Sequence, residues 1–564
     1  MSLVGRTVEL RSTRTADTIL GWLQGHGIER IYGIPGGAVA PLFDALEDSP
    51  IELVMCQHEG MAGYLACGEA LATGRPGVVL VTSGPGVLNT ITPVAAAFQD
   101  EIPLLVLAGE VRTDWSGRGA LQDGGPAGLD VRSIFRSVTR FQDELSQPER
   151  VEHLLAAAWD AAMTHPRGPS LLRVPVDLCA ETASVPEWRA SVQAKSCSHP
   201  GLELAAELLA EAQRPALLAG VGARSAGLGP WLEELAYRMR MPILTDLEAK
   251  GVVSETDPLC LGLHGPGQGP AVSAYVAGGI DVLLSVGSRL DDTVTHGFAA
   301  LRPSRALIQL DHDPGRLHRA WKAELGFVGD LRLLCEALLE ACEPLPPLEL
   351  LRRHALITEA RGAEVAEPHE MLEAPFDPHG VVIELQRRWG GDAIFLTDIG
   401  NHMLFTAHSL VVERPGAFHA SVGLAGMGSG IGAAMGMAAG LGAGKPVVCV
   451  CGDGGLLMVG NELATCARYR IPVVLCVFDD GYLGMVEAGM QAVYGRTGTG
   501  LLPPVSVCAF ARSLGAAVID VGRPADLRPP WDMEGPLVLR VPIDPSVRLA
   551  NPRDAGFGSE HSHG

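Results

Sequence analysis

The sequence predicts an α/β protein made of three doubly wound domains, each built on a parallel sheet. Length is the first reason, because 564 residues exceed a single hydrophobic core and correspond to about three or four domains. The second reason is that short, continuous apolar runs alternate with helical patterns, as expected for strands that are covered on both faces. The third is a segment rich in Pro, Glu and Arg near residues 343–378, which separates the last block from the others.

The expected strands fall into three blocks. In the first block, residues 12–185, they span residues 31–34, 52–55, 77–82, 103–108 and 170–174. In the second block, residues 198–342, they span residues 215–220, 241–244, 281–287 and 306–311. In the third block, residues 379–548, they span residues 393–398, 446–451, 472–478 and 537–541. Residues 343–378 are expected to form an exposed linker with some helix, and residues 549–564 a polar, mobile tail.

Composition narrows the classes of function. Lys and Arg number 43 against 65 Asp and Glu, and the formal net charge of −22 disfavours nucleic acids and anionic membrane surfaces as partners. A hydrophobic content of 47% excludes a disordered chain. Because no run of about 20 apolar residues and no signal-peptide pattern is evident, we expect a cytoplasmic protein. Its 12 scattered cysteines are expected to be free, buried thiols.

The strongest chemical signal lies in the third block. Residues 452–455, Gly-Asp-Gly-Gly, follow an apolar strand, and a second apolar strand ends at residues 478–482. Parallel strands bring Asp453 and Asp480 to the edge where open α/β sheets bind ligands. The glycines allow an anion to approach closely, and the helix that follows favours phosphate. Two carboxylates beside a diphosphate suit Mg²⁺, although either aspartate alone would more often be a turn or cap residue.

This unit resembles the thiamine diphosphate motif of the acetolactate synthase and pyruvate decarboxylase superfamily, which begins with Gly-Asp-Gly and ends at a paired Asn. The resemblance implies that Asp453, Asp480 and the backbone carbonyl of Tyr482 hold Mg²⁺ beside thiamine diphosphate. The sequence departs from the motif at Asp480, where Asn is usual. An extra negative charge there must be offset by tighter cation binding or by protonation, and we expect an intact Mg²⁺ site.

The first block carries the matching half of the site. Residues 57–60, Gln-His-Glu-Gly, end a strand and open a helix. Glu59 aligns with the glutamate that contacts the aminopyrimidine ring of thiamine in this family, where a carboxyl group promotes the imino tautomer that takes the proton from C2 of the thiazolium. Residues 32–37 and 82–89 also resemble acetolactate synthase segments. The cofactor contacts that they imply are Ile34, Pro35, Gly36, Pro85 and Asn89.

The third block supplies the remaining contacts that the resemblance implies. Residues 398–402 resemble a diphosphate-contacting Gly-Gln-His loop, with Asn401 in place of Gln, and residues 423–428 resemble the loop that holds the bent cofactor. Met427 would be the apolar wedge between the two rings, and the Ala425 carbonyl would accept a hydrogen bond from the 4′-amino group. The implied contacts are Gly400, Asn401, His402, Ala425, Met427, Gly452, Gly454, Gly455 and Met485.

The reaction that the resemblance implies is decarboxylation of a 2-keto acid, with pyruvate as the expected donor, and transfer of the resulting acyl carbanion to a carbonyl acceptor. Gln122 aligns with a catalytic-site Gln of acetolactate synthases, with Leu121 in place of the neighbouring Phe. The His residues typical of simple decarboxylases are absent from the matching segments, which favours a carboligase. Val176 and Gly489 stand where biosynthetic acetolactate synthases have Lys and Trp, so a larger or different acceptor is expected.

Four alternatives to an acetolactate-forming carboligase stay open at this point. They are a non-oxidative 2-keto acid decarboxylase, a flavin-linked pyruvate oxidase, a CoA-thioester lyase and a non-catalytic homologue. Donor, acceptor, product stereochemistry and any regulatory subunit are not determined by the sequence.

The resemblance also assigns roles to the three blocks. They correspond to a pyrimidine-binding domain (12–185), a central FAD- or nucleotide-type domain (198–342) and a diphosphate-binding domain (379–548). Residues 286–295, with Arg289, and the strand that ends at Asp311 resemble a flavin site, so FAD is a further candidate cofactor, although the nearby glycines would also serve as turns. Because the family joins the first block of one subunit to the third block of another in each active site, a homodimer or homotetramer is expected.

Overall fold

The computed structural model describes residues 11–185, 201–363, 369–371, 373–527 and 533–549. The chain divides into two compact units. The first comprises the described parts of Met1–Ala194, Gly432–Gly442 and Asn461–Ile471, and the second comprises those of Lys195–Ile431, Ala443–Gly460 and Pro472–Gly564. The first unit holds one six-stranded parallel sheet and the second holds two, which confirms the predicted α/β class with three doubly wound sheets.

The sheet of the first unit has the strand order β3-β2-β4-β5-β7-β6, and every pair is parallel. Its strands are β2 (Arg30–Gly33), β3 (Glu52–Met55), β4 (Gly77–Val81), β5 (Leu104–Glu110), β6 (Phe141–Glu144) and β7 (Pro169–Pro175). A separate antiparallel pair joins β1 (Arg11–Arg14) to β8 (Thr182–Val185).

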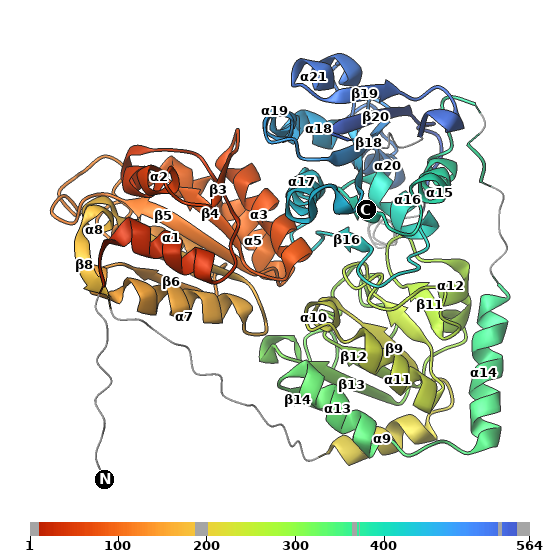
Figure 1. The fold of residues 1–564 in the computed structure, drawn as a ribbon. Helices are drawn as coiled ribbons and strands as arrows, with labels where there is room; N and C mark the ends of the chain where they lie inside the picture. Colours follow the sequence, from red (N-terminus) through yellow and green to blue (C-terminus); the bar gives the residue numbers. More distant parts are fainter. Residues whose placement is uncertain (1–10, 186–200, 364–368, 372, 528–532, 550–564) are drawn as a thin grey trace, which may run out of the picture. The chain divides into compact units, whose positions relative to one another are not determined.

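Helices cover both faces of this sheet (Figure 1). On one face α1, α2 and α7 share a core with Leu105 and Leu107 of β5, and on the other α3 and α5 pack together, with α3 against β4. The sequence fits this arrangement because the interior strands are apolar on both sides. The helices of this unit's first block are α1 (Thr15–Gly25), α2 (Ala40–Leu46), α3 (Glu59–Thr73), α4 (Pro85–Leu88), α5 (Ile91–Gln99), α6 (Val131–Phe135), α7 (Val151–Met163) and α8 (Val176–Ala180).

Two helices from the third block of the sequence also contribute to the first unit, namely α17 (Ser429–Leu441), from Gly432 onward, and α19 (Leu463–Arg468). A Cβ added to Gly68 of α3 would lie 1.9 Å from the Ala433 carbonyl oxygen, and one added to Gly436 would lie 1.7 Å from the Leu65 carbonyl oxygen. The backbones of α3 and α17 are therefore in direct contact. This contact explains why the sequence of α17 is interrupted by glycine at nearly every turn.

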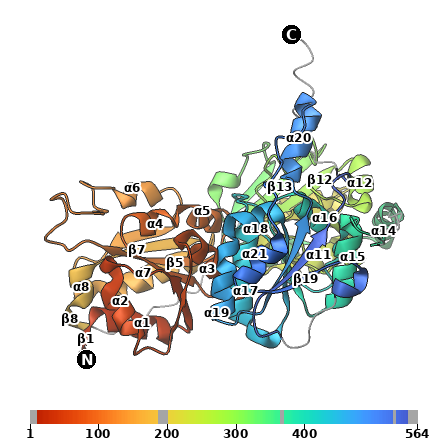
Figure 2. The same ribbon diagram turned by 90° about the horizontal axis from the view of Figure 1, so that it is seen from above.

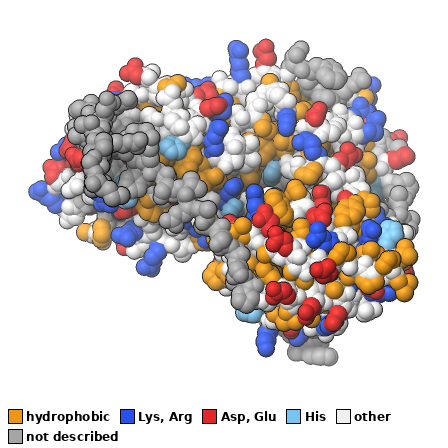
Figure 3. Space-filling model, turned by 60° about the horizontal axis from the view of Figure 1, so that its bottom comes forward, with side chains coloured by type: hydrophobic (Ala, Val, Ile, Leu, Met, Phe, Trp, Pro, Cys, Tyr) orange, Lys and Arg blue, Asp and Glu red, His pale blue; other side chains and the backbone are white. Residues whose placement is uncertain are grey.

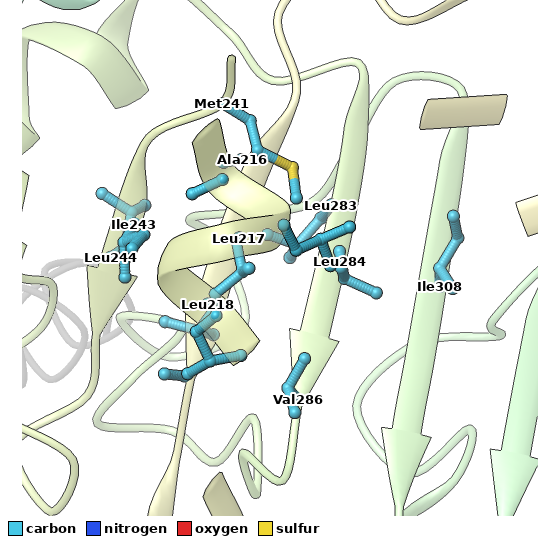
Figure 4. Close-up of a cluster of buried hydrophobic side chains, with 14 of the residues drawn as sticks. Ala216, Leu217, Leu218, Met241, Ile243, Leu244, Leu283, Leu284, Val286 and Ile308 are labelled. Carbon is cyan, nitrogen blue, oxygen red and sulfur yellow. The ribbon is translucent and has the colours of Figure 1, made fainter. Parts of the chain in front are cut away.

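The central sheet belongs to the second unit and has the order β11-β10-β9-β12-β13-β14, again parallel throughout. Its core is continuous across neighbouring strands, as the side chains of Leu217, Ile243, Leu284 and Ile308 show in Figure 4. Its elements are α9 (Leu202–Glu211), β9 (Ala216–Ala219), α10 (Val221–Ser225), α11 (Gly229–Met239), β10 (Ile243–Thr245), β11 (Cys260–Leu263), α12 (Pro270–Ala277), β12 (Val282–Val286), β13 (Ala306–Asp311), β14 (Leu325–Val328) and α13 (Leu331–Ala341).

The segment that was predicted to be an exposed linker, residues 343–378, is in part a packed helix. Helix α14 (Pro347–Arg361) lies against the central domain, and its Arg353 side chain is only 1% exposed. The guanidinium group donates to the carbonyl oxygens of Leu209, Ala212 and Met239, at the ends of α9 and α11. The expected helix is present and most of its residues are at least partly exposed, but Arg353 is buried because unsatisfied carbonyls at helix C-termini can hold a charged side chain. Residues 364–368 and 372, and the predicted tail beyond Leu549, lie outside the described residues.

The third sheet also lies in the second unit, in the parallel order β16-β15-β17-β18-β20-β19. Helices flank it on both sides, with α18 and α21 on one side of the strands and α15 on the other (Figure 2). Its elements are α15 (Pro378–Trp389), β15 (Ile394–Thr397), α16 (Asn401–Ser409), β16 (Phe418–Ala420), β17 (Val447–Gly452), α18 (Asp453–Val459), β18 (Val473–Asp479), α20 (Gly484–Tyr494), α21 (Val507–Ser513), β19 (Ala517–Asp520) and β20 (Leu537–Pro542).

Three sequence expectations about the surface and the thiols can be compared with the structure. The cysteines that the structure describes are all free, and all except Cys508 are buried, as predicted. Among the described residues, none of the helices has the length and hydropathy needed to cross a bilayer. On the face drawn in Figure 3, acidic and basic side chains are interspersed, rather than forming the basic stripe that nucleic acid would require.

Candidate functional site

A cavity of about 280 Å³ lies in the second unit where β15, β17 and β18 end. Every third-block residue that the sequence suggested for the cofactor or the metal lines it. These are Gly400, Asn401, His402, Ala425, Met427, Gly452, Asp453, Gly454, Gly455, Asp480, Tyr482 and Met485. The topology explains the clustering, because consecutive parallel strands deliver their carboxyl ends to the same sheet edge.

Two carboxylates share one wall of this cavity. Asp453 Oδ1 accepts from the Gly454 amide at 2.7 Å, and its Oδ2 accepts from the Gly481 amide at 2.8 Å. Burial raises the pKa of Asp453 to about 7, and the neighbouring Asp480 adds to the effect. Burial also raises the pKa of Asp480, whose Oδ1 accepts from the Tyr482 amide at 3.0 Å. A bound divalent cation would relieve the repulsion between these carboxylates, so the donor set fits Mg²⁺.

Asn401 and His402 open helix α16 beside the carboxylates. His402 is 7% exposed, and its Nε2 has no hydrogen-bond partner among the described residues. Burial lowers the pKa of His402 to about 4. A buried, unpaired ring nitrogen at the start of a helix is suited to a phosphate oxygen. The residues present therefore fit a diphosphate group together with a metal ion.

A buried carboxylate that the sequence analysis did not single out, Asp398, orders the loop above this cavity. Its oxygens accept from the Gly428 amide at 2.8 and 2.9 Å and from the Gly430 amide at 3.1 Å. Its burial raises its pKa to about 6. The same loop carries Met427 and Ala425, and Ala425 has a φ of 55°, a left-handed conformation that disfavours side chains. Asp398 thus holds the two cofactor-loop candidates in place through backbone amides.

The glycines in the turn after β17 are explained by close contacts with protein atoms, in addition to the anion approach that the sequence suggested. A Cβ added to Gly455 would lie 2.3 Å from Asp398 Oδ2, and one added to Gly454 would lie 2.6 Å from a Leu483 methyl carbon. These glycines therefore leave room for the neighbouring Asp398 and Leu483 side chains, and they also line the cavity without side chains of their own. The only helix that follows directly, α18, has seven residues, and the Gly454 amide already donates to Asp453.

Glu487 is a second buried carboxylate that the sequence did not indicate. Its side chain is 6% exposed and accepts from the amides of Gly498 and Gly500, the latter at 3.1 Å. Leu483, which lines the cavity, donates its amide to the Gly500 carbonyl at 2.7 Å. Glu487 therefore fixes the segment that crosses beside the metal-ligand candidates. No sequence pattern marks it, because its partners are backbone amides eleven and thirteen residues away.

In the first unit, Glu59 is the first residue of α3, directly after the turn that follows β3. The N-cap His58 accepts from the Gly60 amide at 3.0 Å, so it caps the start of this helix. Asn89 Nδ2 donates to Glu59 Oε2 at 2.9 Å, so two of the predicted cofactor residues contact each other. Glu59 is half-buried.

The turn that carries Glu59 is held by Glu462, a residue with no assigned role in the sequence analysis. Glu462 is 1% exposed, and its Oε1 accepts from the amides of Gln57 at 2.8 Å and His58 at 3.0 Å. Its Oε2 accepts from Thr465 Oγ1 at 2.7 Å. Glu462 thus orients the backbone that leads into α3.

The other first-block candidates occupy the turns after β2 and β4. Ile34 is half-buried, Pro35 is exposed, and a Cβ added to Gly36 would lie 2.5 Å from Thr82 Cβ. Pro85 is exposed at the start of α4. All lie at the carboxyl end of the same parallel sheet as Glu59.

Gln122 lines a second cavity, of about 630 Å³, at this edge of the first unit. It has a φ of 64°, and Ser83 Oγ donates to its Oε1 at 3.4 Å. A Cβ added to Gly84 would lie 2.6 Å from Gln122 Cγ, so glycine is needed there for the side chain to lie across the turn. Gln122 and Glu59 belong to the same unit, but no hydrogen bond joins them in the described structure.

The two flavin candidates, Arg289 and Asp311, lie where β12 and β13 end in the second unit. Arg289 is 8% exposed, forms an ion pair with Glu248, and its Nε lies 3.6 Å from an Asp291 oxygen. Asp311 is 2% exposed and lies 3.7 Å from a nitrogen of Arg316. A Cβ added to nearby Gly220 would lie 2.2 Å from Ser288 Cα, so this glycine serves the packing of neighbouring turns.

Three family models match the chain, and each match falls in the part of the sequence that forms one of the three sheets. The N-terminal thiamine pyrophosphate (TPP) binding domain of thiamine pyrophosphate enzymes matches residues 13–127. The central domain of these enzymes matches residues 202–338, and their C-terminal TPP binding domain matches residues 398–532.

The alignments with related proteins cover most of the chain. A probable acetolactate synthase large subunit from Methanocaldococcus jannaschii is 32% identical over 498 residues, which cover 85% of this chain and 82% of the relative. The isozyme 2 large subunit of acetolactate synthase from Escherichia coli is 30% identical over 94% of this chain and 95% of the relative. The isozyme 3 large subunit from the same organism is 32% identical over 91% and 90%.

Proposed function

Because the chain belongs to the acetolactate synthase-like family of thiamine pyrophosphate enzymes, we propose that it decarboxylates a 2-keto acid, with pyruvate as donor, and transfers the acyl unit to a carbonyl acceptor. The chain is thus a thiamine diphosphate-dependent enzyme that acts on small molecules and forms C–C bonds. The observation that carries the specific proposal is the cavity of the second unit, where Asp453, Asp480, Asn401 and His402 meet.

The cofactor half-site in the second unit divides its tasks among these residues. When bound, thiamine diphosphate supplies the nucleophilic carbon and the electron sink for decarboxylation. Asp453, Asp480 and the Tyr482 carbonyl would hold Mg²⁺, and Asn401 and His402 would donate to the diphosphate. A further set would contact the cofactor through backbone and apolar atoms, namely Gly400, Ala425, Met427, Gly452, Gly454, Gly455 and Met485.

The first unit provides the proton-handling group. Glu59, oriented by the Asn89 amide, would exchange a proton with N1′ of the aminopyrimidine. Ile34, Pro35, Gly36 and Pro85 would flank the ring. Gln122 would contact the substrate, since it lines a cavity while its oxygen accepts from Ser83.

The experiment that tests the proposal is a pyruvate turnover assay with thiamine diphosphate and Mg²⁺, in which CO₂ and organic products are followed by mass spectrometry. We expect CO₂ together with a C–C coupled product. Acetaldehyde as the sole product would favour a simple decarboxylase, and oxygen consumption would favour an oxidase. Failure to bind the cofactor would support a non-catalytic homologue.

We further propose that the enzyme is a homodimer or homotetramer whose active sites use Glu59 of one subunit and Asp453 of another, as the resemblance implies. Co-expressing Glu59→Gln and Asp453→Ala subunits should then restore activity, to about half of the wild-type level in purified hybrid dimers, because one of the two sites in each hybrid is intact. Differently tagged subunits, purified in tandem, give the measurement. Restored activity no greater than that of either variant alone would contradict a shared site.

We propose that the central edge does not hold the flavin that the resemblance suggested. Arg289, a flavin candidate of this edge, is already paired with Glu248. Burial raises the pKa of Asp246 at this edge to about 6, and the nearby Arg289 opposes that rise. We therefore expect the purified protein to lack flavin absorbance near 450 nm and to release no flavin on acid extraction. Stoichiometric FAD would show that the Arg289–Glu248 pair opens to admit it.

A further inference from the structure

The cavity of about 630 Å³ in the first unit is formed by the turns that follow four parallel strands. Ala38 follows β2, Ser83 follows β4, the segment with Arg112 to Gln122 follows β5, and Val176 follows β7. This is the edge at which parallel sheets bind ligands. Its volume lies within the range of small-molecule sites and exceeds the needs of a two- or three-carbon substrate.

The cavity presents large apolar side chains that nothing in this unit covers. Leu121 is 87% exposed and Trp115 is 53% exposed, and both line the cavity together with Val176. Exposed Trp and Leu side chains in one concave site mark a binding surface, because burying them against a ligand removes apolar area from water. The flat indole suits an aryl or branched alkyl group.

The two arginines at the mouth of the cavity differ in whether a carboxylate pairs with them. Arg112 is paired with Asp114, since its Nε donates to Asp114 Oδ1 at 2.9 Å. Arg118 also lines the cavity, but it donates a hydrogen bond to the Asp114 carbonyl oxygen at 3.3 Å, and no carboxylate pairs with it among the described residues. An arginine without an anionic partner at the rim of an apolar cavity is suited to a ligand carboxylate.

The lining segment is held in shape before any ligand arrives. Asp123 is 4% exposed and accepts from the Gly117 amide at 2.6 Å and the Gly125 amide at 2.9 Å. Glu110 accepts from the Gly124 amide at 3.0 Å and pairs with the buried Arg173 at 3.1 Å. These bonds fix both ends of the segment that carries Trp115, Arg118 and Gln122, so the site is preorganised.

We propose that this cavity binds the acceptor of the transfer reaction and that the acceptor is a 2-keto acid with an aryl or branched alkyl body. This inference rests on the proposed function and names its second substrate. Arg118 binds the carboxylate, Trp115 and Leu121 pack on the apolar body, and the Gln122 amide donates to the keto oxygen. In the reaction the C1–C2 bond of pyruvate breaks with release of CO₂. The acetyl carbon bonds to the keto carbon of the acceptor, whose oxygen takes a proton.

Calorimetry tests the site without relying on turnover. The Glu59→Gln protein, loaded with thiamine diphosphate and Mg²⁺, is titrated with phenylpyruvate, pyruvate and phenylacetaldehyde. We expect phenylpyruvate to bind about tenfold or more tightly than pyruvate, which lacks the aryl group, or phenylacetaldehyde, which lacks the carboxylate. Adding the Arg118→Gln substitution should lower the affinity for phenylpyruvate about tenfold and leave the affinity for phenylacetaldehyde unchanged. Adding Trp115→Ala should lower the affinity for both aryl compounds.

Arg136→Gln is the matched control, because Arg136 is exposed in the same unit, just beyond α6, and does not line the cavity. Equal affinities for phenylpyruvate and pyruvate would overturn the proposal, as would an effect of Arg118→Gln no larger than that of Arg136→Gln.

A competition assay separates the failure of this inference from failure of the proposed function. The wild-type enzyme receives equal pyruvate and phenylpyruvate, and coupled products are identified by mass spectrometry. We expect acetyl transfer to phenylpyruvate to dominate and Arg118→Gln to shift the products toward acetolactate. CO₂ release with acetolactate as the dominant wild-type product would overturn the inference and leave the function standing. Absence of CO₂ with any 2-keto acid would overturn the function, while the calorimetry would still decide whether the cavity binds aryl 2-keto acids.

Discussion

Glu59→Gln is expected to lower turnover by about 10²–10⁴-fold, the range typical of a lost general acid–base group. The amide has nearly the same shape and can still accept the hydrogen bond from Asn89, which lies 2.9 Å away in the native protein. It cannot exchange a proton with the aminopyrimidine. The loss should therefore appear in kcat, while thiamine diphosphate binding changes little.

Steady-state assays with pyruvate and calorimetric titration of the cofactor give the two required measurements. Glu47→Gln is the control, because Glu47 is an exposed acid of the same unit, just beyond α2. A Glu59→Gln enzyme with more than about a tenth of wild-type kcat would contradict the assigned role. Loss of cofactor binding with a loss of folded structure would instead assign Glu59 to the stability of the turn that Glu462 holds.

The sequence predicted the interior of each sheet better than its edges. Strands β4, β5, β17 and β18 are continuous apolar runs because both of their faces are covered. The strands that were not predicted are β6, β11, β14, β16 and β19, and all of them are edge strands, apart from the separate β1–β8 pair. β6 reads Phe-Gln-Asp-Glu and is half-exposed, so it has no apolar run to detect. Edge strands are commonly short and polar, which limits unwanted pairing.

The candidate site divides in the same way between what sequence could and could not indicate. Side chains that contact a ligand, such as Asp453 and Asn401, follow strands in short patterns with fixed spacing, so the sequence indicated them. Asp398, Glu462 and Glu487 act on backbone amides of other turns. An amide donor is present in almost every residue, so no sequence pattern reveals which turn such a carboxylate will hold.

Asp453→Ala is expected to weaken thiamine diphosphate binding by about 100-fold or more in the presence of Mg²⁺, and to abolish turnover with it. Asp453 links both sides of the metal site, because its two oxygens accept from the amides of Gly454 and Gly481. Alanine would remove a metal ligand and leave both amides without that acceptor.

A substitution at the neighbouring Asp480 is the more informative comparison. Asp480→Asn keeps an oxygen that can bind Mg²⁺ and removes one negative charge beside the diphosphate, so cofactor affinity should be kept or improved.

The measurement is cofactor affinity by calorimetry at several Mg²⁺ concentrations, with Asp392→Asn as an exposed control in the same unit. A shared metal site predicts that Asp453→Ala and Asp480→Ala both lose affinity and that added Mg²⁺ recovers little of it. Because buried carboxylates repel each other, removing one of them without a bound cation would stabilise the folded protein. The Asp480→Ala protein should accordingly melt at a higher temperature than wild type without Mg²⁺ and at a lower one with Mg²⁺ and cofactor. Full cofactor affinity in Asp480→Ala would show that this carboxylate does not hold the metal.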